Sequence, residues 1–345
     1  MLIPTKPRLA IAALVVSHGL VLLAGFFAPY DPASQDRELP FAPPTRIHFI
    51  DGQKKLHFRP FVYQLRADLE NDGGYYEDQS RIHPLYLFSS GHLFGTDPSA
   101  KVFLIGSDAY GRDQFSRLLY GGRISLFAGL LATAVSLSLG MILGGLAGFY
   151  GRWLDDLVMR TTEMFMALPW LYLLFAVRAF LPLHIAPNGI FLLLITVMGV
   201  IGWARPARLI RGVVLSAKER DYVLAARGFG ASDIYLLRRH VLPQALSVAF
   251  AQAAVLVPTY VLAEVVLSFF GLGVSEPTPS WGNLLASLRQ YNVLESYWWM
   301  FVPALALIPV FLAYYSLFSY YGYYSVGGTA ATEFAAARMG PRTIS

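Results

Sequence analysis

Six long apolar segments constrain the fold of this chain more than any other feature of its sequence. A transmembrane helix needs about 20 consecutive, mostly apolar residues. Segments near that length lie at 9–28, 124–150, 161–182, 189–209, 247–270 and 299–321. Charged residues make up only 14% of the 345 residues, whereas they make up about 25% of a soluble domain. We therefore expect an all-α membrane protein with six transmembrane helices.

Basic residues beside these segments predict how the chain crosses the membrane. Short loops rich in Lys and Arg stay in the cytoplasm, and Lys6 and Arg8 precede the first segment. With six spans, the loop 210–246 lies on the same side as both chain ends, and it too is basic, with Arg211, Lys218, Arg220, Arg227, Arg238 and Arg239. We predict cytoplasmic N- and C-termini, with a cytoplasmic tail over 323–345. Because the cations flank apolar segments, the net charge of +5 indicates membrane anchoring and disfavours nucleic acid as a partner.

The first apolar segment has two interpretations. Cations precede it, as in a secretory signal peptide, but its apolar run is longer than the usual length of about 7–15 residues. No clear cleavage site of small residues precedes Pro29. We therefore favour an uncleaved membrane anchor over 1–28.

A polar segment, 29–105, separates the first two apolar segments and is predicted to form an extracytoplasmic insert. Within it, the stretch RIHFIDGQKKLHF holds two short β-type runs around Asp51-Gly52, a common signal for a hairpin turn. The insert is either a small folded cap or a docking surface for a substrate-delivery protein, and both interpretations stay open. No metal site is expected, because four histidines lack the spacing of metal ligands: His48, His57, His83 and His92.

Small residues recur at every fourth position of the second apolar segment. They are Ala128, Ala132, Ser136, Gly140, Gly144 and Gly148. In lipid, such residues let two helix backbones approach closely. We expect this face to pack against another helix, either in the same chain or in a second subunit.

One acidic residue, Glu264, lies inside the fifth apolar segment. A carboxylate at membrane depth is costly and marks a candidate functional group. Glu264 is either part of a translocation path or a structural acid hydrogen-bonded to a neighbouring helix. Pro169 and Pro258 are expected to kink the third and fifth helices.

Several kinds of catalytic motif are absent from the sequence. No GxxxxGK[ST] phosphate loop occurs, and no lysine follows a glycine, so the chain has no Walker-type ATP site of its own. Neither HExxH nor GxSxG occurs, which removes support for a zinc protease or an elbow-type hydrolase. We expect a protein that is not an enzyme and holds no cofactor. The chain also has no cysteine, so disulfides are excluded.

The loop before the fifth apolar segment is too structured for a passive link. Residues 218–229 have a helical pattern, and Gly230 can end that helix in left-handed geometry. Ser232 can cap a second helix that runs to His240, with Asp233 in its first turn. Ala225 and Ala226 leave a shallow face where a partner can approach closely. The alternative is an amphipathic helix that only lies on lipid.

This loop resembles the EAA loop of ABC importer permeases. The family pattern is Glu-Ala-Ala, three residues, Gly, nine residues, then Ile-x-Leu-Pro. Five residues match that spacing: Ala225, Ala226, Gly230, Leu242 and Pro243. Leu224 replaces the family's Glu, and His240 replaces its Ile. The resemblance implies an ATPase-coupling loop that docks by shape, with less charge than is usual in the family.

Two further stretches resemble the dipeptide/oligopeptide/nickel branch of these permeases, in its second-permease type. They are GSDAYGRDQFSRLLYGGRISL at 106–126 and LSFFGLGVSEPTPSWGNLL at 267–285. The resemblance covers nearly all of 106–310 and implies an importer transmembrane domain over 106–322, containing the second to sixth helices and the coupling loop 210–246.

The resemblance also implies partners and a location. It implies a second homologous permease, two cytoplasmic ATPases that carry ATP and Mg, and an extracytoplasmic substrate-binding protein. The substrate would be peptide-like. The protein would be located in a bacterial inner membrane, which the chain would cross several times. Dipeptide, oligopeptide, nickel and peptide antibiotic all stay open as substrates. A secondary transporter or channel that works without an ATPase is the alternative function.

Overall fold

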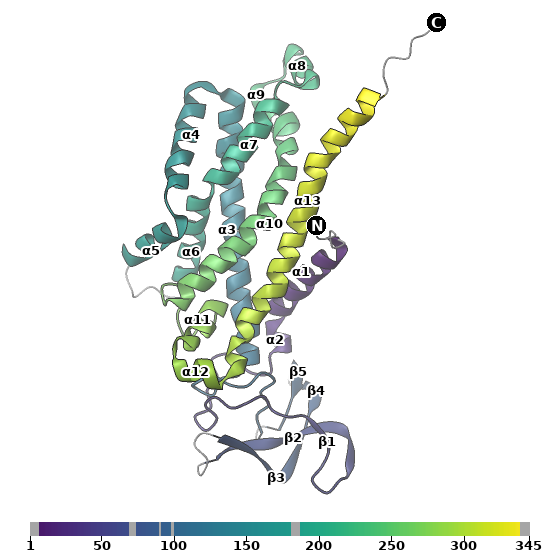
Figure 1. Cartoon of the computed structure of the whole chain (residues 1–345), viewed down its shortest axis with the longest axis vertical. Helices are drawn as coiled ribbons and strands as arrows, with labels where there is room; N and C mark the ends of the chain where they lie inside the picture. Colours follow the sequence, from purple (N-terminus) through teal and green to yellow (C-terminus); the bar gives the residue numbers. More distant parts are fainter. Residues whose placement is uncertain (1–6, 69–73, 90, 98–99, 181–186, 339–345) are drawn as a thin grey trace.

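The computed structural model describes residues 7–68, 74–89, 91–97, 100–180 and 187–338. It is mostly helical, with a long bundle and a small β region at one end (Figure 1). Lys6, residues 181–182 of the third apolar segment and residues 339–345 of the predicted tail lie outside the described residues.

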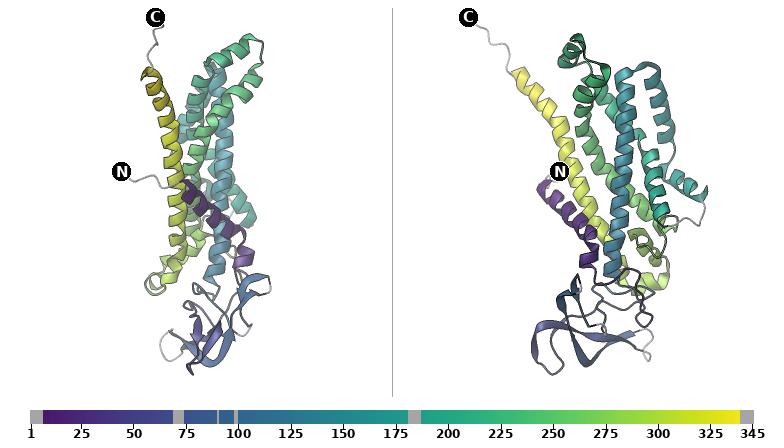
Figure 2. Two further views of the ribbon diagram at one scale, coloured as in Figure 1. Left: turned by 90° about the vertical axis from the view of Figure 1, so that its right-hand side faces the viewer. Right: turned by 180° about the vertical axis from the view of Figure 1, so that it is seen from behind.

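The long helices run back and forth between the two ends of the bundle (Figures 1 and 2). In chain order, the helices are α1 (Pro7–Leu22), α2 (Ala24–Phe27), α3 (Gln114–Tyr150), α4 (Arg152–Ala167), α5 (Trp170–Phe180), α6 (Pro187–Gly202), α7 (Ala204–Ala217), α8 (Asp221–Gly228), α9 (Asp233–Leu236), α10 (Leu242–Phe269), α11 (Trp281–Leu285), α12 (Tyr291–Ser296) and α13 (Val302–Arg338). A π-helical turn (Leu237–Val241) joins α9 to α10, and two 3₁₀ turns (Ala286–Arg289 and Trp298–Phe301) flank α12.

Three helical stretches in the described part of the chain are long and apolar enough to cross a membrane. They are Gln114–Tyr150, Asp233–Phe269 and Trp298–Tyr320. A fourth span results if α6 and α7, which meet at a bend of 44°, are taken as one broken helix. The predicted number of six spans is therefore not confirmed.

Three of the predicted spans are wrong as single long helices. The first, 9–28, is divided into α1 and α2 at Leu23. The fourth, 189–209, is divided into α6 and α7 at Trp203, where the 44° bend lies. The third, 161–182, is interrupted at 168–169, between α4 and α5. Pro169 has no N–H to donate, and its ring pushes the preceding residue out of helical geometry. Leu168 is accordingly extended, with φ −84° and ψ 134°.

The strands all come from the insert. β1 (His48–Ile50), β2 (Leu56–Asp68) and β3 (Gly74–Pro84) form an antiparallel sheet in that order, and β4 (Tyr86–Ser89) pairs with β5 (His92–Gly95). Asp51 organises the turn between β1 and β2, because its Oδ1 accepts hydrogen bonds from the backbone N–H groups of Gln53 and Lys55, both at 2.9 Å. The insert is thus a small β region that extends beyond the one hairpin expected from the sequence.

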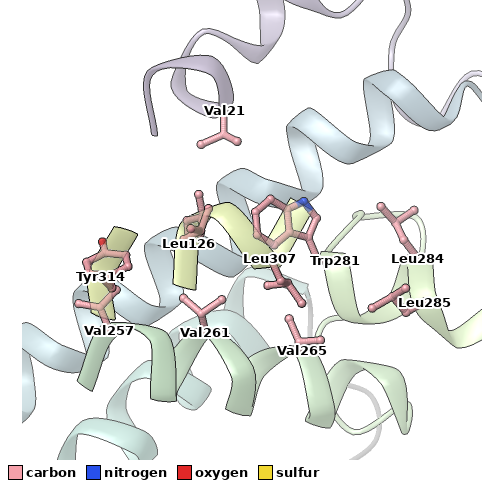
Figure 3. Packing of buried hydrophobic residues seen from close by; sticks show 11 residues of the cluster. Val21, Leu126, Val257, Val261, Val265, Trp281, Leu284, Leu285, Leu307 and Tyr314 are labelled. Carbon is pink, nitrogen blue, oxygen red and sulfur yellow. The ribbon is translucent and has the colours of Figure 1, made fainter. Parts of the chain in front are cut away.

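The largest apolar core joins helices that are distant in the sequence (Figure 3). Val21 of α1, Leu126 of α3, Val261 of α10, Trp281 of α11 and Leu307 of α13 all belong to it. The Trp281 indole also donates a hydrogen bond to the Leu118 carbonyl at 2.9 Å, so the polar edge of this buried ring is satisfied. This core fixes α10 against α3 and α13.

Candidate functional site

The loop singled out from the sequence lies at the end of the bundle opposite the β region (Figure 1). It consists of α8, a turn and α9, and it follows α7 directly. The ends of α3 and α7 lie at the same end of the molecule (Figure 1). The loop is therefore placed to meet a partner that approaches this end of the bundle.

The turn after α8 has the geometry that its sequence predicts. Gly230 has φ +88°, a left-handed value that favours glycine. The N–H of Ala231 donates to the Ala226 carbonyl at 3.1 Å, and the N–H of Gly230 donates to the Arg227 carbonyl at 2.9 Å. These two bonds form a Schellman motif, which satisfies the last carbonyls of the helix. The direction in which the chain leaves α8 is thus fixed by hydrogen bonds.

The second helix starts as expected but does not end where we expected. Ser232 caps α9, its side chain accepting from the N–H of Tyr235 at 3.4 Å, and Asp233 lies in the first turn. The helix does not stop at His240. It continues through the π-helical turn, in which the N–H of Leu242 donates to the Leu237 carbonyl. The wider turn adds a residue just before Pro243, whose ring would crowd an ordinary α-helical turn.

The inner face of the loop is packed firmly onto the bundle. Val223, Leu236 and Val241 are completely buried in a cluster with Phe149, at the end of α3, and Val214 of α7. A cation adds a polar tie, because the Lys218 ammonium donates to the Gly148 carbonyl at 3.0 Å and so caps the end of α3. The loop is therefore attached rigidly to α3, α7 and α10.

The outer face of the loop exposes four large apolar side chains among charged ones. These side chains are Leu224, Phe229, Ile234 and Tyr235, of which Phe229 is 93% exposed. Ala225 is also exposed, and Ala226 is half-buried. Such a patch is typical of a surface that binds another protein. Leu224, at the family's Glu position, is part of this patch.

Sequence reasoning identified the small residues of this face but missed Phe229, Ile234 and Tyr235. All three are bulky and lie on either side of the Gly230 turn and the Ser232 cap. In the structure these three residues lie outside the set of buried apolar residues that includes Val223, Leu236 and Val241. Large apolar residues beside a turn and a helix cap are the sequence signal that could have identified them. Arg227 and Asp233 form an exposed ion pair at 3.5 Å across the turn, and exposed pairs of this kind contribute little.

The small-residue face of α3 packs mainly within the chain. An added Cβ would lie 2.8 Å from Pro206 Cβ at Gly140, 2.3 Å from the Ala207 carbonyl oxygen at Gly144 and 2.9 Å from the Arg211 carbonyl oxygen at Gly148. All three contacts are with α7. The rest of the face, Ala128, Ala132 and Ser136, is buried as well, and the Ser136 hydroxyl is hydrogen-bonded to that of Tyr260 of α10 at 2.9 Å.

Glu264 is completely buried between helices. Its Oε1 accepts a hydrogen bond from the Ser268 hydroxyl at 2.7 Å, and Ser125 of α3 and Ser280 also lie beside the carboxyl group. Trp281 donates its backbone N–H to Ser125 Oγ at 3.0 Å. The acid thus belongs to a small polar cluster that connects α3, α10 and the start of α11.

A cavity of about 270 Å³ lies beside α10. Leu174 of α5, Met198 of α6, Arg205 of α7, and Gln252 and Tyr260 of α10 contribute to its wall. The wall is mostly apolar with a few polar groups, as is usual for sites that accept small molecules. This cavity could not be predicted from the sequence, because its wall combines residues of five helices, α4, α5, α6, α7 and α10.

The two remaining motifs meet at the end of the bundle beside the β region. Arg112 and Arg117, from the stretch 106–126, both donate to Glu276, from the stretch 267–285, each at 2.7 Å. Asp108 accepts from Arg112 at 2.7 Å. Arg117 is only 1% exposed, so its charge depends on these acids for compensation. The interaction joins the start of α3 to the loop after α10.

No group of three or more His, Asp or Glu side chains in the described part of the chain could hold a metal ion. The candidate site consists of the two features described above, the exposed face of the loop and the cavity beside α10.

Comparison with known proteins places most of the chain among transport permeases. Residues 140–322 match the family model described as "Binding-protein-dependent transport system inner membrane component". The chain is 36% identical over 208 residues to the dipeptide transport system permease protein DppC of Bacillus subtilis (strain 168), which is 60% of this chain and 62% of that protein. It is 36% identical over 224 residues to the oligopeptide transport system permease protein OppC of the same organism, covering 64% of this chain and 70% of that protein.

A putative peptide permease protein of Brucella ovis is 36% identical over 209 residues, which is 60% of this chain and 67% of that protein. The chain therefore spans about two thirds of the length of the relatives it matches. A crystal structure of an amino acid ABC transporter with histidines covers 59% of this chain and 92% of that chain, with a TM-score of 0.43 and 15% identity. That likeness is weak and supports no conclusion about the fold.

Proposed function

The chain belongs to the family of binding-protein-dependent transport system inner membrane components, and from this premise we propose that it is a permease subunit of an ATP-driven importer of peptides. The names of its relatives, which are dipeptide, oligopeptide and putative peptide permeases, support this substrate class. The observation that carries the proposal is the loop at 218–243, which has a buried inner face and an outer face with exposed apolar side chains.

The energy for transport comes from other chains. The sequence has no phosphate loop, so ATP and Mg bind to two cytoplasmic ATPase subunits. One of these holds the exposed face of the loop, around Ala225 and Phe229, in an apolar groove. A second, homologous permease completes the translocation path, and an extracytoplasmic binding protein delivers the peptide.

The loop can transmit movement because a single helical stretch joins it to the cavity. Residues Asp233–Phe269 form one apolar helix that begins in the loop and carries Gln252 and Tyr260, which line the cavity. When the ATPases close on ATP, they displace the loop. Because the loop is packed on α3 and α7 as well, the bundle moves with it, and the cavity changes its access.

The cavity beside α10 is our candidate for this chain's half of the path. It lies next to the interruption at Leu168 and Pro169, and Leu168 is part of its wall. Arg205 and Gln252 give it groups that can bind a carboxylate and a peptide amide. Glu264 is instead a structural acid, because it is completely buried and hydrogen-bonded to Ser268.

We place the loop in the cytoplasm and the insert 29–105 on the outer side of a bacterial inner membrane. The loop and the β region lie at opposite ends of the bundle (Figure 1), and the loop end is rich in arginine, which favours the cytoplasmic side. Both chain ends are assigned to the cytoplasm on the same rule.

Reconstitution in proteoliposomes tests this proposal. The complete complex should take up labelled dipeptide or oligopeptide only with ATP. Phe229→Asp places a charge in the apolar interface, and we expect it to lower uptake by about tenfold or more, as a loss of 1.4 kcal/mol or more would. Phe229→Leu is the matched control and should keep most of the uptake. Uptake by this chain without any ATPase would overturn the proposal in favour of a secondary transporter or channel.

A further inference from the structure

Strand β4 of the hairpin β4–β5 exposes two apolar residues close to the turn, which we call the tip, on a strained backbone. Leu87 and Phe88 are each 72% exposed, and Phe88 has φ +55°. A bulky residue in the left-handed region is a true outlier, and such strain persists where a structure uses it. In water, this arrangement would combine backbone strain with exposure of two large apolar side chains.

The tip of the hairpin lies beside the end of the first membrane helix. The ring centroids of Phe88 and Phe26, which is in α2, are 6.2 Å apart. On the same hairpin, the Phe94 ring lies 6.5 Å from that of Phe115, in the first turn of α3. Contacts between α2 and β5 agree with this placement (Figure 1). The hairpin therefore lies beside α2 and the start of α3.

An apolar groove continues from the tip across the β region. It has a volume of about 1110 Å³ and is lined by residues of β1, β2 and β4–β5, including Phe49, Phe58 and Leu87. Phe58 is fully exposed. Among the described residues of the wall, Arg59 is the charged one, and its guanidinium lies 5.0 Å from the centre of the Tyr86 ring. Aromatic rings and arginines are the side chains that favour the headgroup level of a membrane.

The apolar surface of α1 indicates what covers this groove. Its side chains Val15 and Val16 are 65% and 59% exposed, and Leu23, between α1 and α2, is 58% exposed. In a membrane such side chains face lipid. Phe26 extends this surface, and Phe88 continues it into the hairpin. We propose that the β4–β5 hairpin inserts into the outer leaflet, with Leu87 and Phe88 at the acyl boundary, and that the groove beside it accepts phospholipid.

This role is independent of the peptide substrate and requires only that α1 lies in the membrane. It gives the insert a fixed height above the bilayer. A protein that covered the same groove, such as the delivery protein, is the other possible occupant, but nothing about the hairpin's contact with α2 requires one.

Single-cysteine spin labelling tests the proposal directly, because the natural chain has no cysteine. Phe88→Cys and Leu87→Cys carry the label at the tip. Val15→Cys, 65% exposed on α1, is the lipid-facing control, and Tyr76→Cys, 50% exposed on β3, is the control in the same insert away from α2. The full chain is reconstituted alone in nanodiscs of phosphatidylethanolamine and phosphatidylglycerol, and collision of each label with oxygen and with a water-soluble nickel chelate is measured.

We expect both tip labels to resemble the Val15 label, with nickel accessibility about tenfold below that of the Tyr76 label, because the hydrocarbon excludes water and polar solutes. Nickel accessibility equal to that of Tyr76 at both tip positions would overturn the proposal. So would labels shielded from both oxygen and nickel, since that result means burial in protein. Protection that develops only when partner proteins are added would assign the groove to a protein.

Discussion

The two ends of the bundle are built on different principles. At the loop end, α8 and α9 are attached by apolar packing and expose apolar side chains on their outer face. At the end beside the β region, the buried side chains of Arg112 and Arg117 are held by ion pairs to Glu276, whose side chain is 46% exposed. Exposed apolar side chains can bind another protein. The buried arginines, in contrast, need acids of the same chain to compensate their charge. The loop end is thus suited to reversible docking, and the other end to a fixed junction.

The largest effect is expected at the fixed junction. Glu276→Ala would leave Arg117 buried with only Asp108 nearby, at 3.5 Å. Removing one partner of a fully buried ion pair costs about 3–5 kcal/mol, which is an upper limit here because the Glu276 side chain is 46% exposed. We expect a clear loss of folded protein, seen as a lower thermal midpoint in detergent. Glu295→Ala, at an exposed glutamate of α12, is the control and should leave the midpoint unchanged; equal midpoints for both variants would show that the junction is not the support we describe.

A somewhat smaller effect is expected where α3 meets α7. Gly144→Leu would force a side chain into the space occupied by the Ala207 carbonyl, and overpacking of this kind costs about 1–3 kcal/mol. Gly212→Ala on α7 adds a methyl group where nothing lies within 4 Å, so that variant should be neutral. The thermal midpoint measures both, and a stable Gly144→Leu variant would mean that α3 and α7 can separate at low cost.

At the loop end, the turn is expected to matter more for transport than for stability. Gly230→Val would place a β-branched residue at φ +88°, which costs about 1–2 kcal/mol and would redirect the chain after α8. We expect the protein to fold but to lose most ATP-dependent uptake in proteoliposomes. Gly228→Ala, also open to solvent but at an ordinary φ, should retain uptake. Normal uptake by Gly230→Val would remove the geometric role of the turn.

The smallest effect is expected at the position that departs from the family pattern. Leu224→Glu restores the family's acidic residue on a side chain that is 45% exposed. If shape carries the docking, the change should be typical of a surface substitution, about 0.5 kcal/mol or less, which is a change in ATP-dependent uptake of about twofold. A tenfold gain or loss would indicate that charge at this position governs the interface.

Local features were predictable from the sequence, and long-range ones were not. Gly230 and Ser232 act within a few residues of themselves, so their roles in the turn followed from local rules. Pro169 was expected to kink a helix and in fact interrupts it. The continuation of α9 into α10 was missed, because a π-helical turn depends on how Leu236 and Val241 are both buried.

The interactions that join distant segments could not be read from the sequence. The two partners of Glu276, Arg117 and Arg112, lie 159 and 164 residues away in the sequence. The small-residue face of α3 could have packed on any of several helices, and it packs on α7. Trp298 and Trp299 are adjacent in the sequence, which does not distinguish their environments. Trp298 is exposed, but Trp299 is buried and donates its indole N–H to the Ser107 carbonyl at 3.0 Å. Tertiary contacts decided each of these outcomes.

The central claim, that an ATPase subunit holds the outer face of the loop, is tested most directly by crosslinking. Ala225→Cys, in the otherwise cysteine-free chain, is assembled with both ATPases, one of which carries cysteines introduced along its permease-facing groove. We predict an efficient crosslink between the two subunits, and none from Tyr291→Cys, which is 75% exposed on α12 near the opposite end. An assembled complex that imports peptide with ATP, yet gives no crosslink from Ala225→Cys at any groove position, would contradict the claim.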